Sequence, residues 1–214
     1  MIRGIEKFFY LFIKMENHCR LTGDPVCKCK RAAGKVVVNF EDFKTILKRV
    51  FTDHAVYTSL LIMQSVPTLQ PDASVITERL LLNPKDIRNL LEPFLGSKVG
   101  SQVEEGFTQH LKLAAGALEP LRLGRSREVK EAVNKLIEQG VKVGTLLGSI
   151  NPSKLSPVVA IKEFETHNNF VVELATLRSQ GKYIEYINLY DIYFDHMMGL
   201  SDLIALALVP NCII

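Results

Sequence analysis

Apolar residues recur at spacings of three and four along most of the chain, which is the period of a helix with one buried face. The repeat is clearest from residue 39 onward, whereas only residues 36–38 have the β-branched character of a strand. The pattern predicts helices at about 39–63, 76–81, 83–96, 98–118, 126–147, 156–181 and 182–209. The part of the chain after residue 38 is therefore expected to be helical.

Helix starts and close-packing positions can also be predicted. Asn39 and Asn83 are expected to cap helices, and Pro84 follows at a first helical position, where its missing N–H costs nothing. Gly140 and Gly144 lie four residues apart and so share one helix face. Without side chains there, a neighbouring helix can approach that face closely.

Four or more of the predicted helices reach the ~20 residues needed to lie side by side across a small domain. We therefore expect an all-α fold, an antiparallel four-helix bundle with additional short helices. Cysteine and lysine are concentrated before this region. The predicted organisation is a basic, cysteine-containing N-terminal arm at 1–37 and a helical bundle domain at 38–214.

Composition agrees with one ordinary domain. The chain has 214 residues, 47% of them hydrophobic and 23% charged, which excludes disordered and collagen-like classes. No apolar stretch approaches the ~18–20 residues of a membrane-spanning helix, so integral membrane insertion is not expected. Residues 1–35 carry eight basic and three acidic side chains, a local net charge of +5. Such an arm is expected to contact nucleic acid only weakly.

The N-terminal arm raises two further questions. Its apolar run at residues 8–13 is shorter than a secretory h-region, so we expect no secretory signal and a cytoplasmic or virion location, with Met15 as an alternative start. His18, Cys19, Cys27 and Cys29 are potential zinc ligands, but their spacing does not match a zinc knuckle. Reduced thiols are the expectation there.

Four histidines fall on the predicted apolar faces of four different long helices: His54, His110, His167 and His196. An imidazole buried without partners is unfavourable, because each ring nitrogen needs a hydrogen bond or an ion. Several histidines at comparable depth in one bundle suggest that they share a partner.

Acids accompany these histidines. Asp86 lies in the first turn of a predicted helix, and Asp191 lies on the last helix. Histidines and carboxylates that converge between bundle helices can form metal sites, and imidazole suits zinc, copper and iron. The sequence thus predicts a His/Asp-lined interior that binds a transition metal through His54, Asp86, His110, His167, Asp191 and His196.

The alternative is that each histidine is satisfied separately by backbone, acid or water. Neither a Glu-x-x-His nor a His-Glu-x-x-His motif is present, and no serine-hydrolase, phosphate-loop or dinucleotide-binding motif occurs. No reaction is therefore indicated. Homo-oligomerisation is expected from an apolar C-terminal tail and from a tyrosine stripe, Tyr183, Tyr186, Tyr190 and Tyr193, interpreted as a packing or dimer seam.

In three blocks, at 51–58, 79–87 and 190–203, the sequence resembles a family of small uncharacterised bacterial helical proteins. FTDHAVYT at 51–58 resembles a [FW]-T-D-H-x-x-[WY]-T block, and RLLLNPKDI at 79–87 resembles an R-L-L-x-N-x-x-D-I block. A Y-D-x-x-x-x-H-M block begins at Tyr190, with Asp202 and Leu203 following. The resemblance covers about residues 48–205 and implies a four-helix bundle without an agreed activity, with the same six histidines and aspartates as its polar positions.

Some positions depart from that family. Where bacterial members tend to carry acids before the Asn151-Pro152 turn, this chain has Gln139, Val141 and Lys142, and Phe194 stands where another histidine is frequent. The resemblance therefore implies a metal site that is reduced or lost relative to the bacterial one.

The combination of arm and bundle also resembles a protein of marseillevirus-type large DNA viruses. This second resemblance implies a different function, a non-enzymatic viral structural or interaction module. Such a module would act by homo-oligomerisation or by binding host or other viral proteins.

Overall fold

The computed structural model describes residues 40–208, and within that range every regular element is a helix. The elements are α2 (Phe40–Ser65), α3 (Ala73–Leu80), α4 (Asn83–Gly116), α5 (Leu118–Arg122), α6 (Ser126–Ile150), α7 (Pro157–Ser179) and α8 (Tyr183–Leu208). The prediction of an all-α bundle is confirmed. The N-terminal arm, the Asn39 cap and the tail beyond residue 208 lie outside the described residues.

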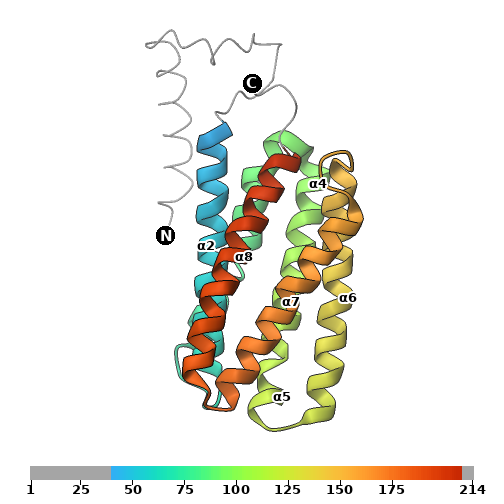
Figure 1. The fold of residues 1–214 in the computed structure, drawn as a ribbon. Coiled ribbons are helices and arrows are strands. Elements are labelled where there is room, and N and C mark those ends of the chain that lie inside the picture. The colour runs from blue at the N-terminus through green and yellow to red at the C-terminus, as the bar shows by residue number, and fades with distance from the viewer. Residues whose placement is uncertain (1–39, 209–214) are drawn as a thin grey trace, which may run out of the picture.

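Long helices lie side by side in the bundle (Figure 1). The main contacts run from α2 to α8, from α8 to α7, from α7 to α6 and from α6 to α4, and α4 also contacts α2. The colours in Figure 1 show that α2, the second half of α4 and α7 run in one direction, while α6 and α8 run in the other. None of the described helices is both long and apolar enough to cross a membrane.

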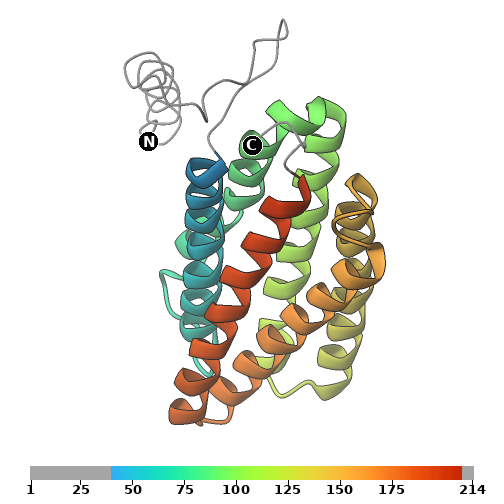
Figure 2. The same cartoon turned by 45° about the horizontal axis from the view of Figure 1, so that its top comes forward.

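The element α4 consists of two helical segments joined at Gly96, which agrees with the break predicted between residues 96 and 98. Gly96 has a φ of 79°, which favours glycine because it has no Cβ. The chain reverses here, so that Arg88 before the turn reaches Glu104 after it, with Nη1 2.8 Å from Oε2. Figure 2 shows this turn at the near end of the bundle.

Glycines on α6 allow α7 to pack closely, as predicted for Gly140 and Gly144. A Cβ on Gly144 would lie 2.6 Å from the Cα of Ile161, too close for any side chain. Gly148 meets the backbone of Pro157 in the same way. The backbones of α6 and α7 therefore touch, and this contact fixes the position of α7 in the bundle.

The tyrosine stripe of α8 is divided between core and surface. Tyr186 and Tyr193 are buried, and the Tyr186 hydroxyl lies 2.6 Å from Oγ of Ser59. Tyr183 is exposed and stacks against the guanidinium of Arg178. Half of the stripe therefore serves packing within the chain, and its proposed role in a dimer remains a prediction.

Candidate metal centre

Three of the predicted histidines meet in the interior. His54 comes from α2, His110 from the second half of α4 and His167 from α7, and each has 3% or less of its surface exposed. One ring nitrogen from each lies within 4.8 Å of the others. The Nε2 atoms of His110 and His167 are 3.3 Å apart. We call these three residues the histidine cluster.

A buried asparagine sets the orientation of His54. The Nδ2 of Asn83 donates to the carbonyl of Val50 at 2.8 Å, so the amide presents Oδ1 to Nδ1 of His54, 3.0 Å away. Because Oδ1 can only accept a hydrogen bond, Nδ1 of His54 must carry the proton. The lone pair then lies on Nε2, the nitrogen with which His54 can bind an ion.

Burial keeps the histidine cluster neutral. Desolvation lowers the pKa of His110 to about 3, with a further contribution from nearby His54. It also lowers the pKa of His167, which is flanked by the other histidines, and that of His54, although the hydrogen bond to Asn83 partly opposes this. At neutral pH the three imidazoles are uncharged, so an ion would not have to displace the extra proton of an imidazolium. The proton shared by Nε2 of His110 and Nε2 of His167 would move to an Nδ1 when both nitrogens bind an ion.

Phenylalanines close one side of the cluster. Each histidine follows an aromatic residue by three positions, and the parallel directions of the three helices place Phe51, Phe107 and Phe164 on the same side. Phe107 lies edge-on to Phe51 and to Phe164, with ring centroids 6.5 and 5.8 Å apart. This phenylalanine layer excludes water from that side.

Hydroxyl groups lie on the other side. Tyr193, on the oppositely directed α8, packs its ring against His167 with centroids 5.7 Å apart. Its hydroxyl faces that of Thr58, and both oxygens are buried with no other polar partner among residues 40–208. Burial raises the pKa of Tyr193, so its phenol is neutral. The surroundings of the cluster are therefore apolar on one side and contain two buried hydroxyls on the other.

His196 lies beside the cluster, between it and the surface. Its ring is stacked on that of His167, with centroids 6.3 Å apart and an interplanar angle of 23°. Its Nδ1 is 3.7 Å from Oε2 of Glu163, while Nε2 is buried without a hydrogen bond. Ile192, four residues before His196 on α8, is exposed, so the buried face of α8 lies further round the helix.

The two predicted aspartate ligands are not brought to the histidines. Asp191 is exposed on α8. Asp86 faces Arg79, with Oδ2 3.9 Å from Nη1, and Arg79 also binds Asp53 at 3.0 Å and covers the ring of Tyr57. Partial burial raises the pKa of Asp86, and Arg79 opposes this shift. These contacts join α2 to α3 and to the start of α4.

Asn83 is the site residue that sequence reasoning missed. It was expected to cap a helix, but the N-cap position belongs to Leu82, no side chain caps there, and the Asn83 side chain turns inward. A second missed signal is the repeated aromatic-x-x-His spacing at 51–54, 107–110, 164–167 and 193–196. The repeated spacing indicates where along each helix the histidines face one another.

The cluster dimensions can be compared with those of a zinc centre. In tetrahedral zinc sites with Zn–N bonds of ~2.0–2.1 Å, neighbouring nitrogens lie ~3.3 Å apart. The separation between His110 and His167 already has this value. The remaining nitrogen, within 4.8 Å of these two, would have to approach by up to ~1.5 Å to reach the same spacing. The residues therefore fit an ion bound by three imidazoles.

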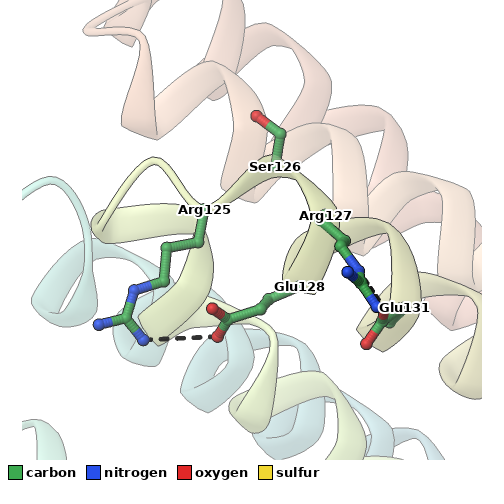
Figure 3. Close-up of a pocket in the computed structure, with 5 residues that line it drawn as sticks. All are labelled: Arg125, Ser126, Arg127, Glu128 and Glu131. Carbon is green, nitrogen blue, oxygen red and sulfur yellow. Dashed lines mark hydrogen bonds and ion pairs between the residues drawn. The ribbon is translucent and has the colours of Figure 1, made fainter.

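A surface hollow at the start of α6 offers a contrast (Figure 3). Its lining consists of Arg125, Ser126, Arg127, Glu128 and Glu131. Both arginines are ion-paired, Arg125 with Glu128 at 3.4 Å and Arg127 with Glu131 at 3.0 Å. Their charges are neutralised locally, so this basic segment is a weak anion site.

Comparison of the chain with protein-family models, with curated proteins and with solved structures finds no match.

Proposed function

We propose that the bundle binds one transition-metal ion through the imidazoles of His54, His110 and His167. The observation that carries the proposal is that one ring nitrogen from each buried histidine lies within 4.8 Å of the others. If each imidazole were hydrogen-bonded to backbone groups of a different helix, the three rings would instead point away from one another. Among residues 40–208, the hydrogen bonds given by these side chains join His54 to Asn83 and His110 to His167.

Energetics support a functional reason for the cluster. Three imidazoles in an apolar interior are expensive, and Nδ1 of His110 and Nδ1 of His167 are buried without partners. Leucine or phenylalanine at these positions would pack at no such cost, as the neighbouring phenylalanine layer does. Binding of an ion would offset the unfavourable burial.

The donor set favours zinc or copper. Non-haem iron sites commonly combine two histidines with a carboxylate. Among residues 40–208 the cluster contains histidines alone, with neither an acid nor a cysteine. Imidazole nitrogens suit zinc and copper, and a three-histidine zinc site leaves a fourth position for water or another ligand. We place that fourth position on the side of Tyr193 and Thr58, because phenylalanines cover the other side.

The test is elemental analysis of the purified, tag-free full chain after equilibration with zinc or copper salts and removal of excess ion. We expect one ion per chain in the wild type and loss of that ion in the variant His54→Gln/His110→Gln. Circular dichroism establishes that the variant remains helical. The variant Cys19→Ser/Cys27→Ser/Cys29→Ser controls for ligands in the N-terminal arm and should keep the ion.

Two results would contradict the proposal. One is wild-type protein without metal, and the other is metal that is retained by the histidine variant but lost from the cysteine variant. Either would favour the alternative, a non-enzymatic viral structural or interaction module.

A further inference from the structure

The histidine cluster is almost wholly buried, so an ion bound there needs a route through the protein. Each ring has 3% or less of its surface exposed, and the phenylalanine layer closes one side. His196 and Glu163 lie on the α8 and α7 side, with 12% and 35% of their side chains exposed. Imidazole and carboxylate are groups that can ligate a metal ion, and these two are more exposed than the cluster.

The two ring nitrogens of His196 have different surroundings, because Glu163 faces only one of them. The carboxylate of Glu163 faces Nδ1 of His196 at 3.7 Å, which favours the proton on Nδ1. The lone pair is then on Nε2, which is buried and makes no hydrogen bond. The His196 ring lies nearly parallel to that of His167. A carboxylate, one imidazole and the three-imidazole cluster thus follow one another from surface to interior.

We propose that Glu163 and His196 form the route by which a divalent cation enters and leaves the histidine cluster, with His196 as a transfer ligand. This inference rests on the proposed metal-binding function. A hydrated cation is first attracted to the Glu163 carboxylate. It then exchanges water for Nε2 of His196 and passes to the cluster, so that its hydration shell is lost in stages.

The position of His196 favours transfer over permanent ligation. It is not part of the group whose nitrogens lie within 4.8 Å of one another. Its ring contacts Phe170, with centroids 5.4 Å apart, and stacks on His167 of the cluster. A side chain that bridges surface and cluster lowers the barrier to exchange without determining the affinity.

The experiment measures both directions of exchange on the full chain. Zinc association is followed by stopped-flow competition with a fluorescent zinc indicator, and dissociation by transfer of zinc to excess EDTA. The variants are Glu163→Gln and His196→Gln, and the matched control is Glu165→Gln, an exposed acid on the same helix. A residue on the route affects association and dissociation equally, because both pass the same barrier.

We expect His196→Gln to slow both rates at least ~10-fold, and Glu163→Gln to slow both in the same direction, with Kd unchanged. Glu165→Gln should behave as the wild type. Unchanged rates in both variants, while wild-type protein binds one zinc ion, overturn the route and leave the metal site intact.

Other outcomes are equally decisive. A weaker Kd with an unchanged association rate would make His196 a permanent ligand and overturn its transfer role. Equal slowing by Glu165→Gln would reduce the effect to general charge attraction and overturn the route. Wild-type protein that binds no zinc overturns the proposed function and this inference together.

Discussion

Nδ1 of His54 lies 3.0 Å from Oδ1 of Asn83, and this hydrogen bond decides which nitrogen of His54 keeps its lone pair. Asn83 is itself held by the carbonyl of Val50, so its amide cannot turn round without losing that bond. The first turn of α4 therefore orients a side chain of α2. Groups that hydrogen-bond to metal ligands set the orientation of those ligands and thereby affect the affinity for the metal.

Replacing Asn83 with leucine should weaken metal binding. The variant keeps the approximate volume but leaves Nδ1 of His54 without an acceptor, so we expect Kd to rise ~10–100-fold. The free energy of unfolding should fall by ~1–3 kcal/mol, because a buried donor is left unsatisfied. Cobalt titration and urea unfolding measure the two effects. Asn188→Leu, at an exposed position of α8, is the control, and an unchanged Kd in Asn83→Leu would contradict the assigned role.

Acid should destabilise the metal-free protein through the histidine cluster. Burial lowers the pKa of His54, His110 and His167, so below the unfolded value of ~6.5 the unfolded chain binds protons that the folded chain does not. The resulting stability is present above that pH and is lost as the pH falls toward 3. Each histidine contributes a slope of ~1.4 kcal/mol per pH unit.

The pH effect is measured by urea unfolding in EDTA between pH 7 and pH 4. His54→Gln/His110→Gln should show a shallower dependence than the wild type, since two of the three groups no longer titrate. Equal slopes would show that the acid sensitivity arises from other residues.

Helix boundaries could be predicted because proline and glycine act locally. Gly96 ends one helical segment and Pro157 opens another, whatever the rest of the chain does. Three buried histidines were also predictable, because polar residues on otherwise apolar faces stand out. Whether His54, His110 and His167 lie at the same level of the bundle depends on how distant helices pack against one another. The spacing of residues along one helix carries no information about that packing.

The acids and Asn83 show where sequence reasoning fails. Asp86 was grouped with the histidines because it is an acid near a helix start, but Arg79 from another helix engages it at the surface. The sequence around Asn83 is equally consistent with a side chain that caps a helix and with a buried side chain, so the pattern alone does not distinguish the two. On α8 apolar residues occur on nearly all sides, including exposed ones such as Ile192, so the spacing alone does not determine which face is buried.

Gly144→Ala should destabilise the bundle. The added Cβ would meet the backbone of Ile161 at 2.6 Å, which a rotamer change cannot relieve, so α6 and α7 must separate. We expect a loss of ~1–3 kcal/mol or more in the free energy of unfolding. Gly199→Ala, with open space around its Cβ in α8, should instead gain up to ~1 kcal/mol from helix propensity. Equal effects in thermal unfolding would contradict the close contact.

Two tyrosine substitutions on α8 should differ in effect. Tyr186→Phe removes a hydroxyl that is bonded to Oγ of Ser59 at 2.6 Å and to its carbonyl at 3.2 Å, so it should cost ~1–2 kcal/mol. Tyr193→Phe removes a buried hydroxyl whose polar neighbour is Thr58 and should cost less than Tyr186→Phe, at most ~1 kcal/mol. Urea unfolding of the metal-free proteins compares them, and an equal or larger loss in Tyr193→Phe would contradict this difference.

The most direct test of the metal centre is anomalous X-ray diffraction from crystals of the zinc-loaded protein, measured above and below the zinc absorption edge. We expect one peak inside the bundle, ~2.0–2.2 Å from a ring nitrogen of each of His54, His110 and His167. Anomalous peaks at surface side chains or in the N-terminal arm, with none between these three rings, would contradict it.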